Sequence, residues 1–246
     1  MSDSIAFRKA PAEAAPRAIG RNHLLSNLAP ADFTLLAPHL SEIALDRGTI
    51  LQEVGQPIKR VYFPHGGLVS LLGVLPDGRA VDTATIGREG AVGLSAGLGP
   101  RVALSRAVVQ LPGHAAQVST ARLAEAAEQS KGLRDMIARY ADILLAQVQQ
   151  SVVCNTVHHV QARLCRWLMH AHDRVEGDTL PLTQEFLSGL LGVQRTTVTA
   201  ICHLLQQEKI IDVRRGRIHI RNVVALEHKA CPCYGVVRSL NQPAEV

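Results

Sequence analysis

The residue pattern of this chain changes at about Thr120, and this change restricts the possible folds more than any other feature. Between about Ile43 and Val118, glycines recur roughly every 8–12 residues, the spacing typical of short antiparallel strands. The segments between them are rich in residues that favour strands. From Thr120 onward the pattern is helical. The sequence therefore predicts an α+β chain with a β-rich unit first and a helical unit second.

The β-rich unit contains four segments that we expect to be strands, VYF, LVSLLGVL, AVDTATI and VALSRAVVQL. Pro76-Asp77-Gly78-Arg79 predicts a hairpin turn, because proline restricts φ and glycine allows a positive φ. A short helical segment within Leu24–Leu40 precedes the strands. We expect an antiparallel, jelly-roll-like β-roll over residues 21–130, after a flexible lead at residues 1–20.

The length of 246 residues and a hydrophobic content of 47% allow two domains, each with its own core. An odd number of cysteines, five, placed mostly in helical segments, favours reduced thiols over a disulfide framework. No segment approaches the roughly 18 apolar residues of a membrane span, and the N-terminus lacks the apolar core of a secretory signal. We therefore expect a cytoplasmic protein without membrane association.

Residues 131–157 are free of proline and predict one long helix. Apolar and small polar side chains recur seven residues apart in two rows of this helix: Leu133, Tyr140 and Gln147 in one, and Ile137, Leu144 and Ser151 in the other. Such rows are typical of a helix that packs along a seam. We expect this seam to join two copies of the chain in a homodimer, and the alternative is packing within the chain's own domain.

The segment LPLTQEFLSGLLGVQRTTVTAICHLLQQEKII predicts two helices joined by a tight turn. Thr183 is a suitable N-cap for the first helix, and Gly192 suits the sharp exit from it. The second helix begins near Gln194 and buries one apolar face. Its outward face is polar and small, and it carries Arg195, Thr196, Thr197, Thr199, Ala200 and His203. This is helix-turn-helix geometry, in which the start of the second helix enters the major groove of double-stranded DNA.

A predicted β-hairpin follows directly, with Ile211, Val213, Ile218 and Ile220 alternating about its turn. Three arginines lie at the tip of this wing: Arg214, Arg215 and Arg217. Between Lys209 and Arg221 the charges sum to 5 − 1 = +4, nearly the whole net charge of +5. Basic side chains at a hairpin tip suit contacts with a phosphate backbone.

The order of β-roll, helix at 131–157, winged helix-turn-helix at 158–225 and tail at 226–246 resembles the Crp/Fnr family of bacterial transcription regulators, over about 22–222. The resemblance implies a homodimer, a cyclic-nucleotide-binding-like sensor domain and a two-fold symmetric DNA site. RNA polymerase and an unknown small-molecule effector remain open as further partners.

Two departures from the family pattern change what we expect. The positions that correspond to the nucleotide pocket are Gly90, Ala91, Val92, Arg101, Val102 and Val148. Ala91, Val102 and Val148 lack the carboxylate and hydroxyls that would hold the ribose, the phosphate and the base, so cyclic AMP is not expected to be the effector. The second helix keeps Arg195 of the family's R-E-T-V-x-R pattern but not its glutamate or second arginine, so the DNA sequence recognised is expected to differ.

Other chemistries have weaker support in the sequence. Cys231 and Cys233 with His228 offer only three potential ligands, so we expect a packed tail and no metal or cofactor there. No catalytic arrangement stands out, so we do not expect an enzyme. The alternative function is a small-molecule or redox sensor module whose winged domain contacts proteins.

Overall fold

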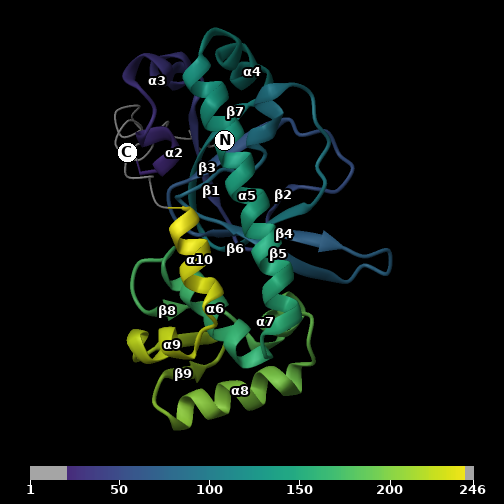
Figure 1. Ribbon diagram of the computed structural model, residues 1–246, viewed down its shortest axis with the longest axis vertical. Helices are drawn as coiled ribbons and strands as arrows, with labels where there is room; N and C mark the ends of the chain where they lie inside the picture. The colour runs from purple at the N-terminus through teal and green to yellow at the C-terminus, as the bar shows by residue number, and fades with distance from the viewer. Residues whose placement is uncertain (1–20, 242–246) are drawn as a thin grey trace, which may run out of the picture.

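The computed structural model describes residues 21–241. The lead expected at residues 1–20 and the end of the tail, residues 242–246, lie outside the described residues. Figure 1 shows a strand-rich unit and a helical unit, with the long helix α5 (Lys131–Val157) running along both. The predicted α+β fold is confirmed.

The strand-rich unit is a β-roll of two antiparallel sheets, with strand orders β1-β7-β3 and β2-β6-β4-β5. Its strands are β1 (Ser41–Leu45), β2 (Ile50–Gln52), β3 (Arg60–Pro64), β4 (Leu68–Val74), β5 (Ala80–Ile86), β6 (Arg106–Leu111) and β7 (Gly113–Ser119). In β3, Val61 and Phe63 are buried on either side of the less buried Tyr62, whereas residues 68–71 of β4 are all buried. The period-two pattern therefore explains the inward face of β3, while the first half of β4 is covered on both faces.

The predicted turn at residues 76–79 connects β4 and β5, whose hairpin projects from the roll in Figure 1. Gly78 has a φ of 85°, which explains the need for glycine there. One expected strand is shorter than predicted, because β6 begins only at Arg106. Val102 forms no more than an isolated bridge to Pro57, and a proline cannot donate the next ladder hydrogen bond.

Short helices surround the roll, and their bounds are α2 (His23–Ser26), α3 (Pro30–Leu36), η1 (Ala37–His39), η2 (Leu94–Leu98) and α4 (Thr120–Gln129). The following helix, α5, has the bounds predicted from the sequence. Its start is capped by Ser130, whose Oγ accepts a hydrogen bond from the Leu133 amide at 2.9 Å. No helix in the described part of the chain is both long enough and apolar enough to span a bilayer.

The face of α5 on which we expected the dimer seam is covered by the same chain. Leu133, Ile137, Tyr140, Gln147 and Ser151 are buried, and Leu144 is half-buried against the roll. The seam residues therefore require correction, because their seven-residue rows serve packing within the chain. The exposed apolar side chains of α5 lie elsewhere on the helix: Leu145, Val152, Val153 and Val157, which are 50–68% exposed.

The helical unit has a three-stranded sheet of order β8-β10-β9 beside its helices. Its elements are α6 (Val160–His172), β8 (Thr179–Leu180), α7 (Gln184–Leu191), α8 (Arg195–Gln207), β9 (Ile211–Arg214), β10 (Arg217–Ile220), α9 (Val223–Lys229) and α10 (Cys233–Leu240). The tail expected from residue 226 also needs correction. Helix α9 begins at Val223, inside the expected winged domain, and α10 packs against α5 and α6.

Candidate nucleic-acid interface

Helix α7 is the first helix of the helix-turn-helix motif, and its two ends match the sequence prediction. The Thr183 Oγ1 accepts a hydrogen bond from the Phe186 amide at 3.1 Å, which caps the helix start. Gly192 ends the helix with a φ of 66°, a left-handed conformation that glycine adopts without strain. The chain therefore turns sharply into α8.

Helix α8 has one buried and one exposed face. Val198, Ile201, Cys202 and Leu205 are buried in the core of the helical unit. The six side chains predicted to face outward are all exposed: Arg195, Thr196, Thr197, Thr199, Ala200 and His203. Figure 1 shows α8 along the outer edge of the helical unit, away from the β-roll. This edge is open to a molecule as large as a DNA duplex.

Two side chains at the start of α8 have partners on α7. The Arg195 guanidinium lies 3.6 Å from the Glu185 carboxylate, and both side chains are about 70% exposed, so the pair is weak and solvent-screened. The Thr199 Oγ1 donates to Gln184 Oε1 at 2.8 Å. Its hydroxyl is thus occupied within the protein, whereas Arg195 can exchange Glu185 for an external partner. Gln184 was not predicted as a site residue from the sequence, because only the folded motif brings it beside α8.

The wing is formed by β9 and β10, which pair from Arg217↔Arg214 to Ile220↔Ile211. At its tip Arg215 has a φ of 31° and Gly216 a φ of 78°, as a two-residue hairpin turn requires. Arg214, Arg215 and Arg217 are exposed and form no ion pair within residues 21–241, whereas Arg221 is paired with Asp212 at 2.6 Å. The tip therefore presents three uncompensated positive charges.

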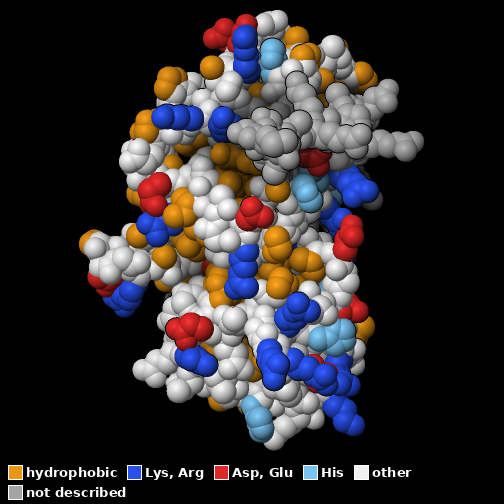
Figure 2. Space-filling view, turned by 180° about the vertical axis from the view of Figure 1, so that it is seen from behind, with side chains coloured by type: hydrophobic (Ala, Val, Ile, Leu, Met, Phe, Trp, Pro, Cys, Tyr) orange, Lys and Arg blue, Asp and Glu red, His pale blue; other side chains and the backbone are white. Residues whose placement is uncertain are grey.

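Positive charge is concentrated at one end of the molecule. Figure 2, seen from behind, shows Lys and Arg side chains gathered at the end that holds the winged domain. Acidic residues there are partly neutralised, because Glu208 pairs with Lys229 at 2.7 Å. A surface of this kind attracts polyanions, with an affinity that falls as salt rises.

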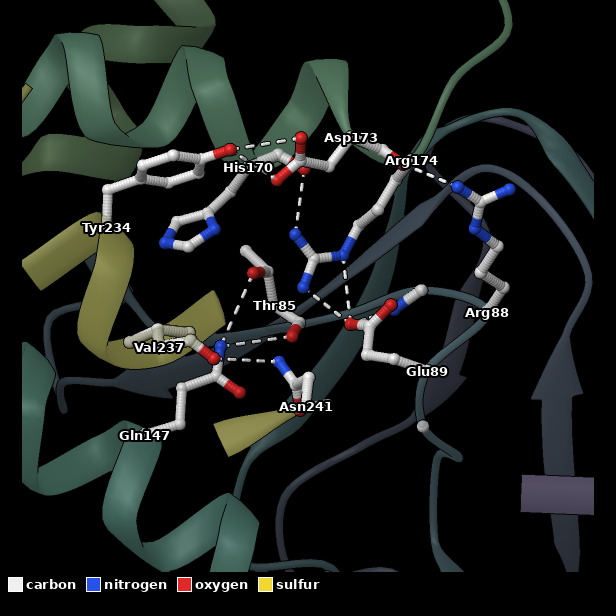
Figure 3. Close-up of polar contacts among 12 residues, drawn as sticks. Thr85, Arg88, Glu89, Gln147, His170, Asp173, Arg174, Tyr234, Val237 and Asn241 are labelled. Atoms are coloured by element: carbon white, nitrogen blue, oxygen red, sulfur yellow. Dashed lines mark hydrogen bonds and ion pairs between the residues drawn. The ribbon is translucent and has the colours of Figure 1, made fainter. Parts of the chain in front are cut away.

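A buried ion pair fixes the winged domain to the β-roll. Arg174, two residues after the end of α6, donates from Nε to Glu89 Oε1 at 2.9 Å and from a terminal nitrogen to the His170 carbonyl at 2.8 Å. Figure 3 shows these residues between the roll and helices α5, α6 and α10. The Arg174 side chain is 4% exposed, so removing either charge would leave the other buried and unpaired. This contact connects the β-roll to the helical unit that carries α8.

The β4–β5 hairpin makes a second contact with α6. The Trp167 indole donates to Asp82 Oδ2 at 2.9 Å, while Asp82 Oδ1 is buried and has no hydrogen-bond partner among the described residues. Burial raises the pKa of Asp82 to about 7, against the opposing hydrogen bond from Trp167. A carboxyl that exchanges its proton near neutral pH thus lies at the junction of the two units.

The positions that correspond to a nucleotide pocket differ in exposure. Gly90, Ala91 and Val92 are buried, Val148 is half-buried, and Arg101 and Val102 are exposed. A Cβ at Gly90 would lie 2.2 Å from the Tyr140 Oη, so Tyr140 of α5 packs directly on this segment. The side chain of Tyr140 thus covers Gly90.

The cysteines of the tail have neighbours that the sequence analysis did not anticipate. Cys231 and Cys233 lie with Cys154 and His158 from the end of α5, and the four ligand atoms are within 4.8 Å of one another. His228, the expected neighbour, is not in this group. The expectation of only three potential ligands is therefore wrong, because Cys154 of α5 and its C-cap His158 join the two tail cysteines in a group of four.

Comparisons with known proteins agree with this geometry. Residues 162–229 match the Crp-like helix-turn-helix domain. A structure described as a transcriptional regulator of the Crp/Fnr family from Eubacterium rectale superposes with a TM-score of 0.67 at 15% identity, covering 85% of this chain and 98% of that one. FixK2 from Bradyrhizobium japonicum gives a TM-score of 0.66 at 18% identity, covering 78% and 98%.

A third structure, the global regulator CLP from Xanthomonas campestris, gives a TM-score of 0.60 at 17% identity, covering 78% of this chain and 99% of that one. At these identities the structural likeness establishes the fold, while the domain match establishes the type of DNA-binding unit. No curated protein sequence matches the chain.

Proposed function

We propose that this chain is a transcriptional regulator of Crp/Fnr type that binds a two-fold symmetric DNA site as a homodimer. The observation that carries the proposal is the exposed face of α8, whose arginine and threonines lie beside an arginine-tipped wing. In this arrangement α8 enters the major groove and the wing contacts the adjacent phosphates.

Each side chain of this surface then has a definite role. Arg195 makes paired hydrogen bonds to a guanine, which offers two acceptors in the major groove. Thr196 and Thr197 contact phosphates or thymine methyl groups, and Arg214, Arg215 and Arg217 hold the backbone. The Thr199 hydroxyl is already bonded to Gln184, so this residue contributes its methyl group.

The homodimer is supported by the exposed apolar side chains on the C-terminal half of α5. Leu145 and Val152 are 56% and 63% exposed and lie seven residues apart, and Ala138 extends the same row. Monomeric proteins rarely leave such a stripe on a long helix open to water. A second copy of α5 covers it and presents two α8 helices to one DNA site.

The sensor unit does not use cyclic AMP in our proposal. Ala91 and Val102 provide no hydrogen bonds to a ribose or phosphate, and Tyr140 packs on Gly90. The similar Xanthomonas regulator is described as responsive to cyclic di-GMP, so an input other than cyclic AMP has a precedent in a protein of this fold.

The decisive experiment is a genome-wide map of DNA bound by the protein, followed by gel shifts on the enriched fragments. We expect a two-fold symmetric motif with half-sites about 10–10.5 base pairs apart, or a multiple of this spacing. Binding should weaken steeply as salt is raised. Binding without sequence preference would contradict the proposal.

The alternative activity is a sensor module whose winged domain contacts proteins. The same experiment separates the two, because such a module would enrich no DNA motif. The three uncompensated arginines at the wing tip favour DNA over a protein surface of mixed charge.

A further inference from the structure

Three thiols and one imidazole converge where α5 meets the helical unit. Cys154 lies in the last turn of α5 and His158 caps its end, while Cys231 and Cys233 lie at the connection from α9 to α10. The Cys154 and Cys231 sulfurs are 3.4 Å apart, and the Cys233 sulfur is 3.6 Å from His158 Nδ1. The three cysteines are buried and His158 is half-buried.

These distances suit one tetrahedral ion. Zinc binds sulfur at about 2.3 Å and nitrogen at about 2.0–2.1 Å, which places ligand atoms about 3.5–3.8 Å apart at tetrahedral angles. All four ligand atoms of the cluster lie within 4.8 Å of one another, so only small side-chain shifts are needed. An iron–sulfur cluster fits this site less well than a single ion. Its ligands would have to lie farther apart, because the whole cluster stands between them, and they are mainly cysteines.

We propose that Cys154, His158, Cys231 and Cys233 bind one zinc ion in a structural site. Three cysteines and one histidine are an established set for structural zinc, and this site has no open position for a reacting molecule. The proposal does not depend on DNA binding, because the ligands lie on α5 and on the α9–α10 connection rather than on α8.

The surroundings of the cluster favour a negatively charged centre. Three thiolates, a neutral histidine and Zn²⁺ carry a net charge of −1. The positive charges of Arg163 and Arg166 act on the thiols, and the Nε atoms of both are buried without a hydrogen-bond partner within residues 21–241. These two guanidinium groups would offset the negative charge of such a centre.

A second residue orients one of the ligands. The Gln150 Nε2, one helical turn before Cys154, donates to the Cys233 sulfur at 3.0 Å. Hydrogen bonds of this kind to a ligand atom commonly tune metal affinity. A disulfide between Cys154 and Cys231 would leave Cys233, His158 and Gln150 without a role, so one ion accounts for more of the geometry.

Zinc at this position would fasten the winged domain to α5. Tyr234 follows Cys233 directly, and its hydroxyl donates to the Asp173 carboxylate at 3.0 Å, at the end of α6. Figure 1 shows α10 beside α5, and Figure 3 shows Tyr234 within the junction between the units. The ion would thus connect α5, α10 and α6, the elements that hold α8 in place.

The test is the metal content of the full-length protein, purified under reducing conditions and dialysed against metal-free buffer. We expect one zinc per chain by mass spectrometry of the metal. Replacement by Co²⁺ should give the absorption bands of a tetrahedral site and the charge-transfer bands of thiolate ligands. Iron with acid-labile sulfide, no retained metal, or a Cys154–Cys231 disulfide in the reduced protein would overturn the proposal.

Variants identify the ligands. Cys233→Ala and His158→Ala should each lower Co²⁺ affinity at least about tenfold, while Cys202→Ala, which removes a buried thiol outside the cluster, should leave it unchanged. Gln150→Ala should weaken binding about 10–100-fold, and the exposed neighbour Gln149→Ala should not. Equal affinity in His158→Ala and Cys202→Ala would reject the ligand set. The cobalt spectrum of the wild-type chain tests the site even if a cysteine variant does not fold.

Discussion

The candidate ligand positions of the β-roll are mostly covered, whereas those of the winged domain are exposed. In the roll, Gly90, Ala91 and Val92 are buried, Tyr140 packs on Gly90, and only Arg101 and Val102 are exposed. In the winged domain, the outward residues of α8 and the wing arginines are exposed together. Where the side chains of a chain cover one another, packing explains them. Where polar and basic side chains are exposed together on one surface, binding to an external partner is the better explanation.

Helix α5 contains the same contrast within one element. Its N-terminal half buries Leu133, Ile137 and Tyr140 in its own chain, whereas its C-terminal half exposes Leu145 and Val152. The buried rows contribute to the stability of the monomer. The exposed row is free to determine assembly, and the largest expected effect concerns this row.

Leu145→Asp combined with Val152→Asp should convert the proposed dimer into a monomer, because a charge is strongly unfavourable in an apolar interface. Loss of the second half-site contact should reduce affinity for the DNA site about 10²–10⁴-fold. Sedimentation and gel shifts measure both effects. Val224→Asp, on a residue 64% exposed on α9, is the matched control. A dimer that survives the double substitution would assign the interface to another surface.

Arg195→Ala should weaken binding to the preferred DNA site by about 1–3 kcal/mol and relax specificity at one position in each half-site. The reason is the loss of a paired hydrogen bond to one base. Binding to a library of sites with single changes measures this. Arg79→Ala, on the distant β4–β5 turn, is the control. An equal loss on every sequence would instead place Arg195 on the phosphate backbone.

Asp82→Asn should change how stability depends on pH. The raised pKa of about 7 means that the folded state holds the proton more tightly than the unfolded state, whose value is near 3.8. Stability from this group is therefore present below pH 4 and is lost as pH rises towards 7, by up to about 1.4 kcal/mol per pH unit. Denaturant titrations at pH 5 and pH 8 measure the free energy of unfolding. Between these two pH values it should fall less in Asp82→Asn than in the wild-type protein. An unchanged decrease would show that Asp82 is ionised at both pH values.

Arg215→Ala should weaken binding to all DNA sequences to a similar extent. Loss of one phosphate contact should reduce the slope of log affinity against log salt by about 0.9. Gel shifts at several salt concentrations measure the slope. A loss confined to the preferred site would mean that the wing reads bases.

The smallest expected effect is that of cyclic AMP, which should produce no binding heat and no change in DNA affinity. Ala91, Val102 and Val148 cannot replace the hydrogen bonds that the nucleotide loses from water. Calorimetry with cyclic AMP and cyclic GMP is the measurement. Micromolar binding that is abolished by Arg101→Ala would contradict this prediction and show that the β-roll binds a cyclic nucleotide through Arg101.

Much of this protein was predictable because the relevant signals are local. The switch from glycine-punctuated strands to helix, the cap at Thr183, the left-handed Gly192 and the wing turn at Arg215-Gly216 depend on neighbouring residues alone. The outward face of α8 follows in the same way, since helical spacing separates Val198 and Leu205 from Thr196 and His203. Side-chain type and spacing determine such features before any tertiary contact forms.

Tertiary structure decided which surfaces are covered. A seven-residue repeat shows that a helix packs along one side, but it does not show what packs there. The rows that contain Leu133 and Ile137 were therefore predicted to contact a partner chain, although the chain's own β-roll unit covers them. The cluster of three cysteines and one histidine at the end of α5 also depends on tertiary structure. Cys154 and Cys231 are separated by 77 positions, and no local pattern can report that α10 returns to α5. Contacts between distant segments depend on how whole elements pack, and residue spacing within one element does not contain that information.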